Sequence, residues 1–536
     1  MPTAAVRPLA CALLLGVAAL ALPARAAPRV EERSVAELQA DMTAGRTTSE
    51  ALVRAYMDRI EKIDRRGPAL HSVIAVNPRA VEDARRLDAE RKAGRVRGPL
   101  HGVPVLIKDN IEDSSGLPTT AGSLALTGNA NGRDAPMVAR MKAAGAVILG
   151  KTNLSEWANI RSTQSISGWS GVGGLVKNPY ALDRNSCGSS SGTGSAIAAS
   201  LGAVGVGTET DGSVTCPSSI NGLAGLKPTV GLVSRTYVVP ISHSQDTPGP
   251  MGRSVADIAA LLTGMAGSDP ADKQTAEADA HKSDYLAALS GASLRGKRLG
   301  VLKYATDRRR DHARLWDQTL AALRAAGAEI VEIKDRPPRE IGPQERQVLM
   351  YELKADLNAY LATTDARRVP SRTLADLIAF NDRTPRELAL FNQDQFETAQ
   401  KLKGLDDPDY VKARAGSLKG AKDAIDKYVS ENKVDALIWP SPGPAWQSDA
   451  AGGDHYSGEG AGNLAAISGY PHLTVPAGYV RGLPVGLSFI GPAWSEARLL
   501  QLGAAFEAAT RARRAPTYAP SVEQTADVAP LLAPAR

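Results

Sequence analysis

The sequence predicts an α/β protein in which buried strands alternate with helices. Three observations favour this class. Short apolar runs at residues 103–107, 146–149 and 203–206 are separated by Gly/Ser-rich turns, as in sheets that are buried on both faces. Strand character returns after residue 436, so a mostly polar-faced helical block at about residues 344–426 is expected as an insertion in one sheet. The chain has 536 residues, 43% of them apolar, which is enough for a large core.

The charge balance excludes several classes of partner. Basic residues number 63 and acidic residues 57, a net charge of +6, and no block of like charges marks a stripe for nucleic acid or a membrane surface. We therefore expect no nucleic-acid partner. The charged fraction of 22% is ordinary for a globular protein and argues against wholesale disorder.

The N-terminus has the pattern of a secretory signal peptide over residues 1–26. Arg7 precedes an apolar run at residues 9–22, and the small-residue motif at residues 24–26 is typical of a cleavage site. The apolar run is shorter than the roughly 20 residues that cross a bilayer, which disfavours the alternative of an uncleaved anchor. We expect export to the periplasm or the medium, with no stable membrane insertion after the signal is removed.

Helix and strand signals continue along the mature chain. Two capping boxes, Ser34 with Glu37 and Thr47 with Glu50, indicate the first two helix starts. A small-residue helix is expected at residues 195–203. Later patterns predict strands at residues 298–302, 329–333, 436–439, 472–475 and 486–490, and helices at residues 315–325 and 496–510.

These elements are expected to form one domain over residues 27–515, followed by a loose Pro-rich tail over residues 516–536. The mature chain would keep two cysteines, Cys187 and Cys216, too few for a disulfide framework. Two cysteines in a chain of this size more often serve as small, unpaired, buried apolar side chains. The alternative is a single disulfide between them, because an exported protein enters an oxidising compartment.

Two motif matches are rejected on physical grounds. Residues 145–152 satisfy the phosphate-binding loop string, but the residues between its glycines are Ala-Val-Ile-Leu, which indicates a strand ending near Lys151 and not a flexible cradle. Residues 188–192 satisfy the nucleophile-elbow string, but a polar loop precedes them where a hydrophobic strand is required.

A third constellation is more specific. Lys108 follows the strand at residues 103–107, and Ser213 follows the strand at residues 203–206 after a short turn. Ligands of α/β sheets gather at the carboxyl ends of strands, so both side chains are expected at one crevice. A serine cluster at residues 189–191 precedes the small-residue helix, whose N-terminus is expected to point at the same crevice.

These residue types suit acyl transfer. A lysine can activate a serine only when the amine is neutral, and burial beside a positive helix end lowers its pKa from about 10.4. A bridging hydroxyl lets a proton pass between groups that do not touch. The turn at residues 210–213 can present successive N–H groups to a developing oxyanion, because Gly212 tolerates unusual dihedral angles.

At these positions the chain resembles the amidase signature family. The serine- and glycine-rich signature runs over residues 188–217, and the flanking stretches at 102–110, 145–157, 222–231 and 472–491 are also similar. The resemblance implies an α/β/α sandwich, with a mixed twisted central sheet covered by helices, and no metal or other cofactor. It implies that Lys108 is the base, that Ser189 is a bridging serine in a cis peptide, and that Ser213 is the acylated nucleophile. It also implies four oxyanion donors, the backbone N–H groups of Thr210, Asp211, Gly212 and Ser213. Apart from the resemblance, Ser190 and Ser191 are expected to support the loop through hydrogen bonds.

The sequence departs from many family members at one point. They carry Gly-Gly-Ser followed shortly by an arginine, whereas residues 211–216 here read Asp-Gly-Ser-Val-Thr-Cys, so recognition of a substrate carboxylate by that arginine is not expected. This segment and the secretory signal are similar to bacterial peptide amidases, which release ammonia from C-terminal peptide amides. The alternatives are an amidase of small aliphatic or aryl amides and a non-catalytic amide- or peptide-binding protein. A tRNA-dependent transamidase component is disfavoured by export and the missing basic surface.

Other candidate residues fit structural roles better. No two histidines or cysteines have metal-ligand spacing, so no metal site is expected. A serine–histidine hydrolase would need one of His101, His243, His455 and His472, none of which has a comparably specific partner pattern. Pocket and core roles are both open for Trp439, Trp446 and Tyr456, and Arg308, Arg309 and Arg310 fit a solvated face. The sequence does not indicate an oligomeric state.

Overall fold

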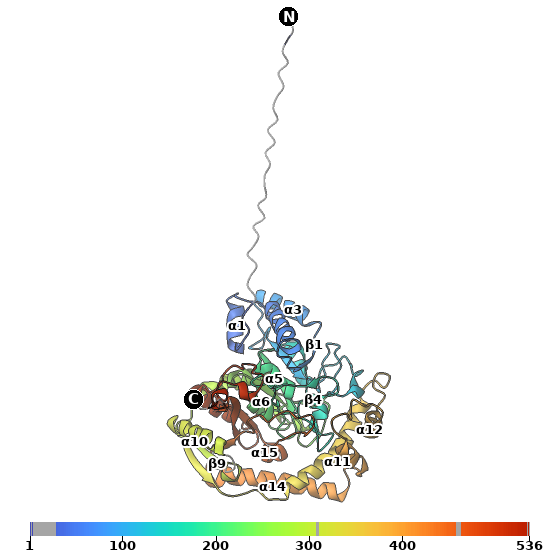
Figure 1. Cartoon of the computed structure of the whole chain (residues 1–536), viewed down its shortest axis with the longest axis vertical. Helices are drawn as coiled ribbons and strands as arrows, with labels where there is room; N and C mark the ends of the chain where they lie inside the picture. The colour runs from blue at the N-terminus through green and yellow to red at the C-terminus, as the bar shows by residue number, and fades with distance from the viewer. Residues whose placement is uncertain (2, 4–27, 307–309, 457–461, 533, 535–536) are drawn as a thin grey trace.

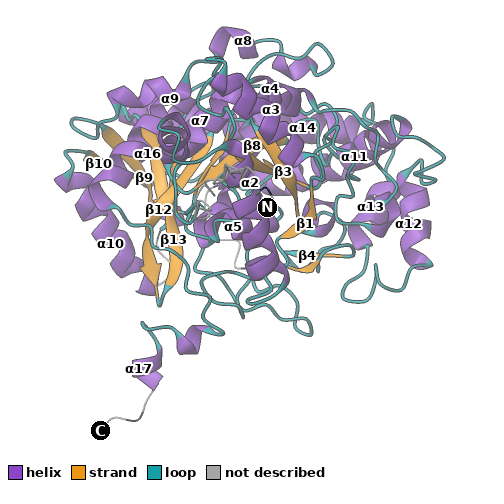
Figure 2. Cartoon of the chain, turned by 90° about the horizontal axis from the view of Figure 1, so that it is seen from above, coloured by secondary structure: helices purple, strands orange, loops and turns teal. Residues whose placement is uncertain are grey.

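One large mixed sheet forms the centre of the molecule, flanked by helices (Figures 1 and 2). The computed structural model describes residues 1, 3, 28–306, 310–456, 462–532 and 534. The sheet has 11 strands in the order β1-β3-β2-β6-β8-β7-β12-β13-β11-β9-β10. Its strands are β1 Val73–Val76, β2 Pro104–Lys108, β3 Val147–Thr152, β6 Val204–Glu209, β7 Ala224–Lys227, β8 Thr247–Gly252, β9 Arg298–Leu302, β10 Glu329–Ile333, β11 Ala436–Pro440, β12 His472–Val480 and β13 Leu483–Ile490. A separate two-stranded sheet pairs β4 Trp169–Ser170 with β5 Gly174–Leu175.

Helices alternate with strands along the chain, as expected of an α/β protein. Their bounds are α1 Val35–Thr43, α2 Ser49–Arg59, α3 Ala80–Lys92, α4 Pro136–Ala143, α5 Ser191–Ala198, α6 Thr215–Ile220, α7 Val255–Met265, α8 Ala278–His281, α9 Tyr285–Ala288, α10 Arg310–Ala325, α11 Ile341–Ala362, α12 Leu374–Asp382, α13 Asp394–Lys401, α14 Pro408–Asn432, α15 Gly462–Ser468, α16 Glu496–Thr510 and α17 Ala529–Leu532. None of the described helices is both long enough and apolar enough to span a membrane. The predicted signal peptide lies almost entirely outside the described residues.

The pairing of the strands places the functional region. Strand β2 runs parallel to both β3 and β6, and Ile107 is the register partner of Val206. Parallel strands end at the same edge of a sheet, so Lys108 at the end of β2 lies beside the segment that follows Val206. The sheet register therefore brings together two segments that are about 100 residues apart in the chain.

The helical block inserted between β10 and β11 contains α11, α12, α13 and α14, and all of its residues are described. It contains no strand. Part of its apolar surface forms a cluster separate from the main core, in which Leu353 and Phe396 pack with Trp157. Figure 1 shows α11 and α14 following one another along one side of the molecule, with α12 near the end of α11.

Three expected helix starts are wrong by one to five residues. The helix expected at residues 315–325 begins at Arg310. The second helix is capped by Thr48, whose side chain accepts from Ala51 N, and the third residue after Thr48 is an alanine that cannot complete a capping box. Helix α5 occupies residues 191–198 instead of 195–203. Its first turn, at residues 191–194, consists of serine, glycine and threonine, whose low helix propensity gives no helical pattern in the sequence. Gly192 in this turn packs against backbone carbonyls: an added Cβ would lie 2.4 Å from the oxygens of Asn153 and Ser72.

The expectation of a loose C-terminal tail is also wrong for much of the segment. Tyr518 N donates to Pro179 O, and Leu182 N donates to Ala519 O. Val522 and Val528 are buried in the main apolar core. The proline-rich composition indicated a lack of regular structure, but it did not reveal apolar residues that pack against the body of the protein.

Candidate active site

Lys108 is buried at the carboxyl end of β2 and is surrounded by oxygen atoms. Its Nζ atom lies 2.7 Å from Ser189 Oγ, 2.9 Å from Thr208 Oγ1 and 3.2 Å from Thr208 O. A charged amine can donate to all three oxygens. A neutral amine can donate to the two atoms of Thr208 and accept the Ser189 hydroxyl proton with its lone pair. The site therefore accommodates both protonation states of this lysine.

The serine cluster is held tightly against the neighbouring strands. The Gly188–Ser189 peptide bond is cis, and Ser189 O accepts from Ser155 N at 3.0 Å. The Ser190 hydroxyl donates to Thr208 O at 3.1 Å and accepts from Thr208 N at 3.2 Å. Ser191 Oγ lies 3.2 Å from Ser155 Oγ at the start of α5. These bonds fix the backbone on both sides of the Ser189 side chain.

Ser213 lies in the turn that follows β6 and faces a cavity of about 210 Å³. Ser190 N donates to Ser213 O at 3.2 Å, which joins the turn to the serine cluster. The cavity is also lined by Gly188, Thr210, Asp211 and Gly212 from the two loops, and by Ile241, Leu349 and Tyr456 from other parts of the chain. Lys108, Ser189 and Ser213, which are distant in sequence, are thus gathered at one edge of the sheet.

The turn that carries Ser213 is anchored by two buried carboxyl groups. Glu209 Oε2 accepts from Val214 N at 2.8 Å and from Thr215 N at 2.9 Å. Asp246 Oδ1 accepts from the Thr210 hydroxyl at 2.6 Å. Gly212 at the apex has a φ of +80°, a conformation that glycine adopts without steric cost. Among the described residues, no hydrogen bond uses the N–H of Asp211, Gly212 or Ser213 as donor.

The two cysteines form a disulfide, which corrects the expectation of unpaired buried thiols. Cys187 and Cys216 are bonded, with Cα atoms 6.1 Å apart. Cys187 directly precedes the Gly188–Ser189 peptide, and Cys216 follows Ser213 by three residues in α6. The sequence contained both partners, but only the fold places them within bonding distance. The bridge joins the two serine-bearing segments and lines the cavity.

Burial dominates the electrostatics of the site. It lowers the pKa of Lys108 to about 7, against the opposing attraction of the Asp246 and Glu209 carboxylates. Burial also raises the pKa of Asp246 to about 6. A substantial share of Lys108 is therefore neutral near pH 7, which an exposed lysine cannot achieve.

The rival histidines and Lys151 bond to groups other than the two serines. No hydrogen bond described in the structure joins a histidine to Ser189 or Ser213; His101 bonds to Leu87 O, and His472 bonds to Ser488. Lys151 lies inside β3, where its Nζ contacts Thr119 Oγ1 at 2.9 Å.

Trp439 is buried in a core cluster, whereas Tyr456 lines the Ser213 cavity and Trp446 lines an adjoining one. Of the basic triplet, only Arg310 is among the described residues.

Three contributors were missed at the level of sequence. Thr208 contacts Lys108, Glu209 holds the turn, and Asp246 reaches Thr210 from a loop before β8. Thr208 and Glu209 are part of the sequence motif that contains Ser213, and strand alternation next to a candidate base could have singled them out. Asp246 carries no local signal, since its role arises from strand pairing between β6 and β8.

Comparison with known proteins decides the family. Residues 51–500 match the protein family described as Amidase. The chain belongs to the amidase family. A probable amidase of Arabidopsis thaliana is 38% identical over 502 residues, covering 91% of this chain and 92% of the relative. The solved structure of native peptide amidase from Stenotrophomonas maltophilia is 49% identical with a TM-score of 0.86, covering 91% of this amidase and 99% of that chain.

Relatives with another printed activity are also found. One glutamyl-tRNA(Gln) amidotransferase subunit, from Halorhodospira halophila, is 36% identical over 496 residues, covering 90% of this amidase and 98% of the relative. The expected family and the expected α/β/α fold are confirmed. The protein is an amidase-signature hydrolase of amides, and the identity of its amide is a separate question.

Proposed function

We propose that this amidase cleaves C-terminal carboxamides of peptides through Lys108, Ser189 and Ser213, by way of an acyl-enzyme. One observation carries the catalytic part: a fully buried lysine lies 2.7 Å from a serine hydroxyl, on a loop that is hydrogen-bonded to the segment carrying a second, cavity-lining serine. A buried amine with a pKa of about 7 can act as a base at neutral pH.

The proposed proton path starts from the hydrogen bond between Lys108 and Ser189 and extends to Ser213 on the neighbouring turn. Neutral Lys108 accepts the hydroxyl proton of Ser189, and Ser189 accepts the proton of Ser213 as the Ser213 oxygen attacks the amide carbon. The tetrahedral intermediate collapses when the nitrogen receives a proton by the same path, and ammonia leaves. Water then attacks the Ser213 ester while its proton passes through Ser189 to Lys108. The acid leaves as that proton returns to the Ser213 oxygen, which restores the free hydroxyl.

The turn at residues 210–213 supplies the oxyanion donors in this proposal. Its N–H groups have no acceptor among the described residues at Asp211, Gly212 and Ser213, and the turn is fixed on both sides by Glu209 and Asp246. Donors held before the reaction need no reorganisation when charge develops on the substrate oxygen, and each is worth about 10²–10³ in kcat.

The choice of peptide amides rests on similarity and on the cavity. The solved relative at 49% identity is a peptide amidase. The Ser213 cavity adjoins a second cavity of about 440 Å³ through Tyr456, which provides room for residues preceding the amide. Small aliphatic amides and aryl amides remain the competing substrates, and a binding protein without turnover remains the competing function.

The decisive variant is Ser213→Ala. Ammonia release from an amidated dipeptide should fall by at least about 10⁴-fold, because no acyl-enzyme can form. The fold should persist, since the Ser213 contact to the serine cluster is made by its carbonyl group. Ser218→Ala, at a buried serine in α6 whose hydroxyl has no described partner, is the matched control and should keep activity. Normal turnover in Ser213→Ala would remove this serine from the mechanism.

The substrate class is tested by comparing initial rates on three amides at pH 8: an amidated dipeptide, acetamide and acetanilide. The proposal expects kcat/KM for the dipeptide amide to exceed the other two by about 100-fold or more, because only the peptide uses binding groups away from the reacting carbon. A higher kcat/KM for either small amide would reassign the substrate. Absence of the amine product from all three, ammonia for the dipeptide amide and acetamide and aniline for acetanilide, would favour a binding protein.

Export is the last part of the proposal and rests on residues 1–26 of the sequence. Expression of the full chain in a Gram-negative bacterium, followed by N-terminal sequencing of the mature protein, should give Ala27 as the first residue. Recovery of the intact N-terminus from the cytoplasm would contradict it.

A further inference from the structure

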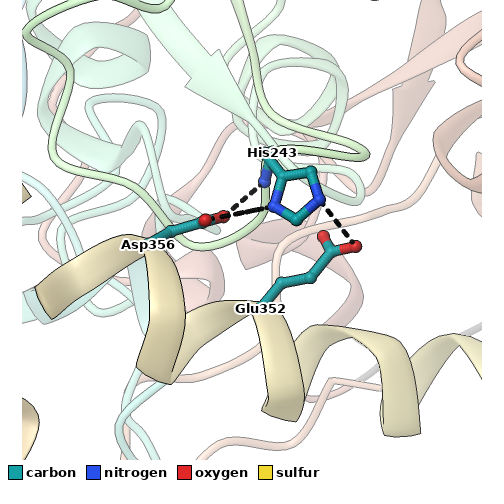
Figure 3. A group of neighbouring side chains, drawn as sticks. All are labelled: His243, Glu352 and Asp356. Carbon is teal, nitrogen blue, oxygen red and sulfur yellow. Dashed lines mark hydrogen bonds and ion pairs between the residues drawn. The ribbon is translucent and has the colours of Figure 1, made fainter. Parts of the chain in front are cut away.

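A histidine and two carboxylates form a cluster outside the catalytic residues (Figure 3). His243 belongs to the loop before β8, and Glu352 and Asp356 lie one turn apart on α11. His243 Nδ1 is 3.0 Å from both Asp356 oxygens, and Nε2 is 3.4 Å from Glu352 Oε1. His243 N also donates to Asp356 Oδ2 at 2.6 Å.

The geometry favours an imidazolium over a metal ion at this place. Each ring nitrogen faces a different carboxylate. One metal ion can bind only one of the two ring nitrogens, whereas an imidazolium can donate a hydrogen bond from both. The Glu352 oxygens are already occupied: they accept from Ser244 Oγ at 2.5 Å, Tyr410 OH at 2.7 Å and Ser244 N at 3.2 Å, and also from the Ser242 hydroxyl. A metal would have to displace these donors.

The loop held by this cluster reaches the turn proposed to bind the oxyanion. Gln245 Nε2 donates to Thr210 O at 3.2 Å and to Glu345 Oε1 of α11 at 2.8 Å. Asp246 accepts from the Thr210 hydroxyl and from the backbone N–H of Ile241 at 2.8 Å. Ile241 of the loop and Leu349 of α11 both line the Ser213 cavity. The loop thus transmits the position of α11 to the catalytic turn.

We infer that His243 is a positioning residue, which in its protonated form fastens the loop at residues 241–246 onto α11 and thereby holds the Thr210 turn and one wall of the Ser213 cavity. The inference rests on the proposed function for its catalytic consequence, and on the geometry alone for its effect on stability.

The charged groups around His243 set the direction of its pH dependence. Asp356 and Glu352 of α11 favour the imidazolium, while burial and Arg235, whose guanidinium donates to His243 O, oppose it. Tyr410 of α14 faces the cluster through Glu352. His243, Asp356 and Arg235 line a cavity of about 450 Å³. The other charged side chains that line it are those of Asp246, Asp272 and Lys273.

The net result is a raised pKa of His243, caused first by its bond to Asp356. A group whose pKa is higher in the folded state stabilises that state fully below its unfolded pKa of about 6.5, and loses the effect as pH rises through the folded value. The link between loop and helix is therefore strong at mildly acidic pH and weak at alkaline pH.

The test compares wild-type protein with His243→Gln in two measurements between pH 5.5 and pH 9. The melting temperature of wild type should exceed that of the variant by about 1–2 °C below pH 6.5, because the pair is partly exposed and the chain is long, and the difference should shrink by more than half at pH 9. The ratio of wild-type to variant kcat/KM on an amidated dipeptide should follow the same curve, falling from about tenfold to about twofold. This ratio of variants cancels the titration of Lys108.

Asp356→Asn provides a second perturbation that keeps an acceptor for His243 N. It should move the midpoint of the wild-type curve to lower pH, since the imidazolium loses its main partner. His281→Gln is the matched control, because this exposed histidine stacks on Trp494 away from the cluster. It should show no pH-dependent difference from wild type.

Three results would overturn the inference. A melting difference that is constant across the pH range would make His243 a simple packing residue. A curve that Asp356→Asn leaves unmoved would exclude the ion pair. Stabilisation of wild type, but not His243→Gln, by added zinc or manganese would reassign the cluster as a metal site. If no amide is turned over at all, the melting measurements still decide the inference.

Discussion

Thr208→Val tests the proposed base more sharply than removal of Lys108 itself. Valine has nearly the shape of threonine but lacks the Oγ1 atom that lies 2.9 Å from Lys108 Nζ. The Ser189 hydroxyl and Thr208 O, at 2.7 Å and 3.2 Å, remain as partners of the amine. The variant therefore removes one of three hydrogen-bond partners without changing the charge of the site.

The magnitude follows from the two protonation states. A hydrogen bond from an ammonium is worth roughly 1 kcal/mol more than one from a neutral amine, and about 1.36 kcal/mol corresponds to one pKa unit. Loss of the bond should lower the pKa of Lys108 from about 7 by a further ~0.7 unit. The neutral form then persists to lower pH, so the acidic limb of kcat/KM moves down by the same amount.

The assay is ammonia release from an amidated dipeptide at low substrate concentration between pH 5 and pH 9. Relative to its own plateau, Thr208→Val should be about fourfold faster than wild type at pH 6. Because Asn110 Nδ2 also loses its acceptor, a stability loss of about 1–3 kcal/mol is expected, and unfolding should be measured alongside. Thr319→Val, at a buried threonine on α10, is the matched control and should leave the limb unmoved.

An acidic limb that stays in place, or moves to higher pH, would refute this account of the base. Burial raises the pKa of Asp246 to about 6, so this carboxyl group is a rival origin of the limb in wild type. Asp246 makes no described hydrogen bond to the Thr208 side chain. The shift in this variant therefore separates Lys108 from that carboxyl group.

Two further predictions follow from the turn and the disulfide. The double variant Cys187→Ser/Cys216→Ser should lose roughly 3–4 kcal/mol of unfolding free energy in urea titrations, because the bridge closes a chain segment with a sequence separation of 29; an unchanged midpoint would show that the bridge contributes nothing to stability. Gly212→Ala should lower kcat by about tenfold or more with a smaller effect on KM, since a Cβ has free space there but a φ of +80° strains the backbone that carries the oxyanion donors; a loss confined to KM would contradict a role in the transition state.

Local sequence patterns correctly predicted those elements whose bounds are decided by local residue spacing. The strands at residues 298–302 and 329–333 and the helix at 496–510 have the predicted bounds, because apolar runs and helical spacing decide them. Helix α5 was misplaced because its first turn, at residues 191–194, consists of residue types with low helix propensity. Gly192 in that turn packs against the carbonyls of Asn153 and Ser72, which come from other parts of the chain. The tail was misjudged for a similar reason, as Val522 is buried by residues far from it in sequence.

The sequence by itself determined the fold class, the family and the residue types of the candidate catalytic centre, because strand ends, a lysine and spaced serines lie in recognisable motifs. Only the tertiary structure decided which atoms meet: the register of β2 on β6 places Lys108 against Thr208, and the fold pairs Cys187 with Cys216. It also decided the protonation chemistry, since the pKa of Lys108 depends on complete burial. The contact between His243 and α11 belongs to the same category. Burial and long-range contact are properties of the packed chain, and no local pattern of residues encodes them.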